Sequence, residues 1–144
     1  MENLDVYGVC NPIIDLLSHV PDSFLTERGL NKNSMNLITI EEQQALLLAL
    51  ASGKISVEFA AGGSGANTMI GIAQLGGRTA FSGKIGMDEH GTIYREKLED
   101  LGVNALLGEG DGTTGSSLIL VSEDGSRAMN TYLGMSQELQ VQDI

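Results

Sequence analysis

The run Gly62-Gly63-Ser64-Gly65-Ala66-Asn67 combines features that can bind a polar ligand. Its paired glycines let a ligand approach the backbone closely. Asn67 would lie in the first turn of a following helix, whose N-terminus adds free N–H groups and a partial positive charge. Such a turn suits the hydroxyl groups of a sugar. The same residues also fit a plain glycine-rich turn with a local asparagine hydrogen bond.

Asp15 is the second residue of chemical interest. It lies within Ile13–Val20, an apolar segment that follows Asn11-Pro12 and favours a strand. Asp15 either faces water from a surface strand or faces a pocket. In a pocket, each hydrogen bond that its carboxylate accepts would contribute roughly 1.5–3 kcal/mol to binding a polar ligand.

The common phosphate and metal motifs do not fit this sequence. A Walker loop requires four residues between its glycines, whereas Gly77 and Gly83 are separated by five. The dinucleotide fingerprint is matched by the spacing of Gly110, Gly112 and Gly115, but that segment precedes a strand instead of opening a helix. No HExxH, CxxC or GxSxG occurs, so we expect no metal site and interpret His19 and His90 as structural or surface residues.

Composition narrows the range of partners. The formal net charge of −11 argues against nucleic acid and against an anionic membrane surface. The longest apolar run, Ala45–Ala51, is far shorter than the roughly 20 residues that span a bilayer. Cys10 is the only cysteine, and the N-terminus lacks the pattern of a signal peptide. We therefore expect a cytoplasmic protein with a small-molecule partner.

The elements that would position these residues follow an α/β pattern. Strands and helices alternate between residues 57 and 107, which predicts βαβ units and a parallel sheet. Further strands do not follow that alternation and predict a small second sheet, a lid. The lid strands are expected near residues 13–20, 35–40, 55–60, 116–121 and 127–132.

Capping signals set the expected helix ends. Thr39 and Glu42 predict a capping box, Ser64 is expected to cap the helix that carries Asn67, and Asp88 is expected to cap the next helix. Gly108–Gly115 is expected to be a flexible loop.

Several separate segments of the chain together form a family pattern: Gly8–Asp15, Ala61–Asn67, Leu75–Gly77, Gly83–Asp88 with Gly91, Leu101–Val103, and Thr114-Gly115. In these segments and their order, the whole chain resembles the N-terminal half of the PfkB, or ribokinase-like, family of sugar and nucleoside kinases. Three longer segments also resemble the adenosine-kinase-like branch of this family: DSFLTERGL, SMNLITIEEQ and RAMNTYLGMSQEL.

The resemblance implies a ribokinase-like parallel sheet core with a small β lid that closes over the acceptor. It implies transfer of a phosphoryl group from ATP, with Mg²⁺, to a hydroxymethyl group of a sugar or nucleoside. Carried over residue by residue, Asn11 and Asp15 would contact the acceptor from the lid side, and Gly62, Gly63 and Asn67 would hold its hydroxyl groups.

Two further residues are secondary candidates for binding. Ser64 stands where ribokinases often have lysine, which weighs against ribose and favours a nucleoside or another sugar. Arg127 would be a solvated side chain on an ordinary strand, but in a lid it could reach a phosphate or the acceptor.

The family's second signature, a DTxGAGD-like run with the anion hole and the catalytic base, is absent from these 144 residues. We therefore expect an N-terminal part of a PfkB-type kinase domain without its nucleotide-binding half, inactive alone, with the base beyond Ile144. The alternative is a non-catalytic module that binds a sugar or nucleoside or dimerises through the lid.

Overall fold

The computed structural model describes residues 3–144, which form two compact units. The first unit contains the residues up to Ile14, Ala60–Gly115 and Leu133–Ile144, and the second contains Asp15–Phe59 and Ser116–Tyr132. The elements are β1 (Val6–Val9), β2 (Ile13–His19), α1 (Asp22–Glu27), β3 (Ser34–Leu37), α2 (Ile40–Ser52), β4 (Glu58–Gly62), α3 (Ser64–Gln74), β5 (Thr79–Gly86), α4 (Glu89–Asp100), β6 (Val103–Gly110), β7 (Gly115–Val121), β8 (Arg127–Tyr132), η1 (Gly134–Glu138) and η2 (Val141–Asp143).

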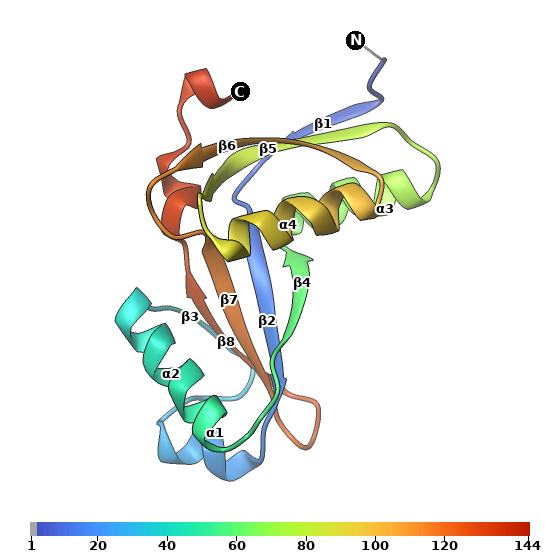
Figure 1. The fold of residues 1–144 in the computed structure, drawn as a ribbon. Coiled ribbons are helices and arrows are strands. Elements are labelled where there is room, and N and C mark those ends of the chain that lie inside the picture. Colours follow the sequence, from blue (N-terminus) through green and yellow to red (C-terminus); the bar gives the residue numbers. More distant parts are fainter. Residues whose placement is uncertain (1–2) are drawn as a thin grey trace. The chain divides into compact units, whose positions relative to one another are not determined.

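The first unit is a three-stranded parallel sheet with strand order β1-β5-β6. Helices α3 and α4 lie along the same face of this sheet (Figure 1). Parallel strands are normally buried on both faces, and the central strand β5 is buried along most of its length. The core between sheet and helices is formed by Met69, Phe81, Ile85, Tyr94, Leu98, Val103 and Ala105, all buried.

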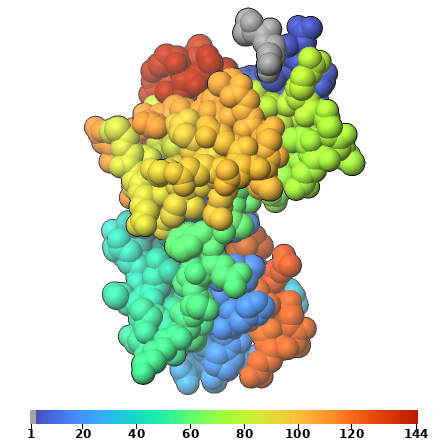
Figure 2. Space-filling view, turned by 45° about the vertical axis from the view of Figure 1, so that its right-hand side comes forward, coloured from blue at the N-terminus to red at the C-terminus, as the bar shows by residue number. Residues whose placement is uncertain are grey.

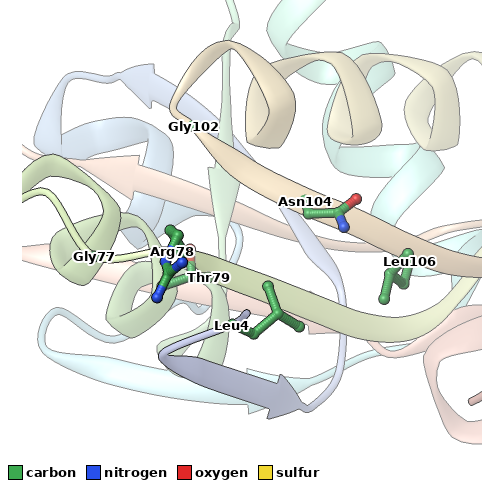
Figure 3. Close-up of a pocket in the computed structure, with 7 residues that line it drawn as sticks. All are labelled: Leu4, Gly77, Arg78, Thr79, Gly102, Asn104 and Leu106. Atoms are coloured by element: carbon green, nitrogen blue, oxygen red, sulfur yellow. The ribbon is translucent and has the colours of Figure 1, made fainter. Parts of the chain in front are cut away.

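The opposite face of this sheet is only partly covered, by η1 and η2. Tyr7 and Val9 of β1 and Leu106 of β6 are each more than two-fifths exposed, because side chains alternate between the two faces of a strand. A hollow of about 560 Å³ is lined on this side by Leu4, Asn104 and Leu106 together with residues at the start of β5 (Figure 3).

The second unit is built on a mixed sheet with strand order β3-β8-β7-β2-β4. β7 and β8 form an antiparallel hairpin whose turn contains Gly125 at a φ of 81°, and β3 pairs with β8 in parallel. Helix α2 packs on β8, and Gln43 of α2 is buried and donates to the carbonyl of Ser116 at 3.3 Å.

The strands of the second unit differ in detail from the expected ranges. β3 ends at Leu37, before Thr39 caps α2 by the expected capping box with Glu42. β4 begins at Glu58 and runs to Gly62, later than expected. The expected α/β class, a parallel sheet accompanied by a separate second sheet, is confirmed, but the second sheet has five strands and the parallel sheet only three among the described residues.

Two local predictions were wrong. Gly63, not Ser64, is the N-cap of α3, and no side chain caps this helix. Gly108–Gly115 is not one loop, because β6 continues to Gly110 by pairing with β5 as far as Gly86. Strand pairing between distant segments overrode the local glycine content here.

Among the described residues, no helix is both long enough and apolar enough to cross a membrane.

Candidate functional site

The glycine turn lies in the first unit, where β4 ends and α3 begins. Gly63 has a φ of 89° and a ψ of 141°, a backbone conformation that L-residues rarely adopt. A Cβ atom on Gly63 would also lie 3.1 Å from the carbonyl oxygen of Asn11. Backbone conformation and close approach thus both require glycine at this position, and the backbone of Asn11 lies against the turn.

Asn67 lies in the first turn of α3 with its side chain exposed. Its backbone N–H donates to the carbonyl of Gly63 at 3.0 Å. Ser64 is also exposed, and its carbonyl accepts a hydrogen bond from the hydroxyl of Thr68. The structure therefore brings five predicted site residues together in the first unit: Asn11, Gly62, Gly63, Ser64 and Asn67.

Cys10 helps to fix the start of α3 and was not predicted to do so. A Cβ atom on Gly65 would lie 2.5 Å from the Cβ of Cys10. Glycine at position 65 therefore lets the first turn of α3 pack directly on the end of β1. A single cysteine carries no spacing signal, so the sequence could not reveal this contact.

Asp15 and Arg127, the other predicted residues, lie in the second unit. Asp15 is half-buried in β2, between the fully buried side chains of Ile14 and Leu16 that point to the other face of the sheet. Burial raises the pKa of Asp15 to about 6, although the positive charge of Arg127 acts in the opposite direction. The carboxylate is thus poorly solvated and has unused capacity to accept hydrogen bonds from a polar ligand.

Apolar side chains extend the sheet face that carries Arg127. Met35 of β3 lies beside Met129 of β8, and Ile119 of β7 lies on the other side of Met129. Met35 is 61 % exposed. A hollow of about 480 Å³ on this face is lined by Asn33, Ser34, Met35, Gly125, Arg127 and Met129. The second unit therefore offers a carboxylate, a guanidinium group and flexible thioethers.

Lys84 and Asp88 are engaged within the first unit. The Nζ of Lys84 forms an ion pair with Asp143 at 2.9 Å, with both side chains largely buried. The carboxylate of Asp88 caps α4 by accepting from the N–H of Gly91, as expected, and also accepts from the N–H and the hydroxyl of Thr114. Both side chains are therefore held by contacts within the first unit.

Within residues 3–144, no group of three or more His, Cys, Asp or Glu side chains is placed to hold a metal ion.

The sequence is similar to a known family and to individual kinases. Residues 35–144 match the pfkB family carbohydrate kinase. Adenosine kinase 2 of Arabidopsis thaliana is 34 % identical over 101 residues, covering 67 % of this chain and 28 % of that protein. Probable fructokinase-6, chloroplastic, of the same plant is 33 % identical over 86 residues, covering 58 % of this chain and 22 % of that protein.

Solved structures agree with the sequence relatives. The crystal structure of adenosine kinase from Sinorhizobium meliloti superimposes with a TM-score of 0.81 at 38 % identity, covering 98 % of this chain and 42 % of that chain. The chain thus spans less than half the length of the kinases that it matches. Its fold is the ribokinase-like α/β fold, and the chain belongs to the pfkB family of carbohydrate kinases.

Proposed function

We propose that the full-length protein transfers a phosphoryl group from ATP to a hydroxymethyl group of a nucleoside or sugar, and that this chain carries the acceptor-binding part. Asn11, Gly62, Gly63 and Asn67 would bind hydroxyl groups in the first unit, with Ser64 as a neighbouring polar contact. Asp15 would accept hydrogen bonds from vicinal hydroxyls in the second unit, where Arg127 could contact the acceptor or a phosphate.

The observation that carries this proposal is the exposed apolar surface of β3, on the same sheet as Asp15. A free sugar offers mostly hydroxyl groups, whereas a nucleoside also offers a flat, largely apolar base. Met35 and Leu37, 61 % and 65 % exposed, are suited to contact such a base, since thioether and aliphatic side chains adapt to flat rings. The adenosine kinases among the relatives support the same preference.

ATP and Mg²⁺ enter this proposal through the family alone. The described residues offer no group of acidic side chains that fits a metal ion, so no contact with Mg²⁺ is assigned to them. We propose that the catalytic base lies beyond Ile144, because no DTxGAGD-like run occurs among these 144 residues. A cytoplasmic setting is part of the proposal and rests on the single cysteine.

The test is an ADP-release assay on the full-length protein with adenosine, ribose and fructose as acceptors. We expect phosphorylation of adenosine with the highest kcat/KM. Asp15→Ala should lower kcat/KM about tenfold to a hundredfold, because at least one charge-assisted hydrogen bond would be lost. Asp111→Ala, in an exposed loop of the first unit, is the matched control and should have no effect. A folded protein that phosphorylates none of the acceptors would contradict the proposal.

A second candidate function is a non-catalytic module that binds a sugar or nucleoside or forms a homodimer through the lid. The specific observation in favour of the dimer is that β3 is an edge strand with exposed Met35 and Leu37. Light scattering on the 144-residue chain would detect a dimer, and a Leu37→Lys substitution should abolish it. Ligand-induced stabilisation of the chain without turnover would favour the binding module.

A further inference from the structure

Tyr94 links helix α4 to the glycine turn. Its side chain is fully buried, and its ring packs at 6.4 Å from the ring of Phe81 in the sheet core. Its hydroxyl donates a hydrogen bond to the carbonyl oxygen of Gly62 at 3.1 Å. Helix α4, yellow to orange in Figure 2, therefore reaches from the surface of the first unit to the turn that holds the predicted site residues.

This hydrogen bond sets the direction of the peptide group between Gly62 and Gly63. No cis peptide bond occurs among residues 3–144, so the carbonyl of Gly62 and the N–H of Gly63 point in opposite directions. A carbonyl that points toward Tyr94 therefore turns the Gly63 N–H away from the core. Without the hydroxyl, this peptide between two glycines would be held less firmly, because glycine backbones have more conformational freedom than other residues.

The next carbonyl of the turn is also held within the unit. The Gly63 carbonyl accepts the N–H of Asn67, the first backbone bond of α3. Both carbonyls of the turn are thus bound by groups of the first unit. The N–H groups at the start of the helix, which have no partners inside the helix, face away from those bonds.

We propose that Tyr94 is a positioning residue for the acceptor: its bond to Gly62 aims the Gly63 N–H at a hydroxyl oxygen of the bound sugar or nucleoside. This inference rests on the proposed function, because it requires the acceptor to bind at the glycine turn. Tyr94 does not touch the acceptor and takes no part in proton transfer. The bond from Tyr94 holds the donor in place before the ligand binds, so that less conformational entropy is lost on binding.

The experiment compares the full-length wild type with Tyr94→Phe, which keeps the ring and removes only the hydroxyl. We expect the KM for the acceptor to rise about five- to tenfold, as for the loss of one hydrogen bond. The KM for ATP should stay within about twofold, because the variant leaves the rest of the protein unchanged.

The matched control is Leu98→Val, one helical turn further along α4 and equally buried. It weakens the packing of α4 without removing the hydroxyl, so the thermal midpoint should fall while the acceptor KM stays unchanged. An equal rise in acceptor KM for both variants, or no rise for Tyr94→Phe, would overturn the inference.

A second readout separates this inference from the proposed function. In the unliganded protein, Tyr94→Phe should shift the NMR resonances of the Gly62 carbonyl carbon and the Gly63 amide, whereas Leu98→Val should not. If the wild type phosphorylates no acceptor but these resonances shift, the proposed function fails and the positioning of the peptide stands. If the resonances do not move, the positioning role is refuted whatever the activity.

Discussion

Asp15 is a carboxylate held in an environment that disfavours its charge. Burial raises its pKa to about 6, and the nearby positive charge of Arg127 offsets only part of that effect. Partly burying a carboxylate without a hydrogen-bond partner costs free energy in the folded state. This environment fits a carboxylate whose hydrogen-bonding capacity is satisfied only when a ligand binds.

The first prediction concerns the pH dependence of acceptor binding by the full-length protein. The ionised form of Asp15 accepts hydrogen bonds from hydroxyl groups, so affinity should fall as the pH drops below about 6. Well below the pKa, the loss approaches about tenfold per pH unit. Calorimetric titration between pH 5 and pH 8 measures this change in acceptor affinity. Asp15→Asn should bind the acceptor weakly at every pH, because it has no carboxylate to titrate.

Stability should respond to pH in the opposite direction. The folded state keeps the proton of Asp15 up to about pH 6, whereas in the unfolded chain its pKa is near the ordinary value of 3.8. The contribution of Asp15 to the free energy of unfolding therefore decreases as the pH rises from 3.8 to 6. Denaturant titrations of wild type and Asp15→Asn would contradict this if their difference did not change over that range.

At Asp88, in contrast to Asp15, burial affects the pKa less than the hydrogen bonds together do. Burial alone would raise the pKa of its carboxyl group, but hydrogen bonds from Thr114 and Gly91 outweigh burial and hold the pKa below its ordinary value. The hydroxyl of Thr114 in turn accepts from the N–H of Gly86. One carboxylate thus ties the start of α4 to the segment that leads into β7.

The second prediction is that Asp88→Ala lowers the free energy of unfolding by about 1–3 kcal/mol, from the lost cap and the unsatisfied donors. The contribution of Asp88 should persist above its ordinary pKa and disappear as the pH falls through its lowered pKa. Asp100→Ala is the control, because Asp100 lies at the C-terminal end of the same helix and is exposed. Its removal should be neutral or slightly stabilising. An equal loss of unfolding free energy in both variants would contradict the prediction.

At the scale of elements, glycines allow close backbone approach where β5 ends and α4 begins. A Cβ atom on Gly86 would lie 2.1 Å from the carbonyl oxygen of Gly112 and 2.8 Å from the backbone nitrogen of Thr114. A Cβ atom on Gly91 would lie 2.3 Å from the carbonyl oxygen of Gly86. These neighbours are backbone atoms and cannot rotate aside, so the segment 112–114 can reach Asp88 only because both positions lack a side chain.

The third prediction compares two glycine-to-alanine substitutions. Gly86→Ala should destabilise by about 1–3 kcal/mol or more, since the backbone must shift. Gly71→Ala, in the middle of α3 with no atom within 4 Å of the added methyl group, should stabilise by about 0.5–1 kcal/mol. Urea unfolding of both variants measures the difference. A neutral Gly86→Ala would show that the close approach has no energetic importance.

At the scale of the whole molecule, the described residues leave part of one face of the parallel sheet exposed. Tyr7, Val9 and Leu106 form an exposed apolar surface on the side opposite to α3 and α4. Parallel sheets are normally covered on both faces, and apolar surfaces of this kind mark sites of association. We expect this surface of the 144-residue chain to bind hydrophobic molecules or other copies of the chain.

The fourth prediction is that the double substitution Val9→Thr and Leu106→Thr lowers hydrophobic dye binding and self-association of the 144-residue chain. The free energy of unfolding should change by less than about 1 kcal/mol, because both side chains are already exposed and threonine suits a strand. Leu75→Thr is the control, since Leu75 is 91 % exposed just after α3 and away from this face. Sedimentation of all variants at several concentrations measures the effect.

Much of the fold was accessible from the sequence because its signals are local. The capping box of Thr39 and Glu42, the cap of Asp88 and the hairpin around Gly125 each depend on residues a few positions apart. Ser64 was misassigned because glycine and serine both serve as N-caps, and only the φ of Gly63 distinguishes them. The end of β6 was misplaced because its last residues are ordered by β5 and not by their own propensity.

By itself, the sequence determined the family, the alternation of strands and helices, and the glycine turn with Asn67, because residue type and short spacing encode these features. Only the tertiary structure decided that Asn11 and Cys10 pack against that turn, that Thr114 completes the bonding of Asp88, and that Tyr94 orients the peptide at Gly62. The partners in these contacts lie between 26 and 55 residues apart. No local pattern records such pairs, because they form only when the sheet brings distant segments together.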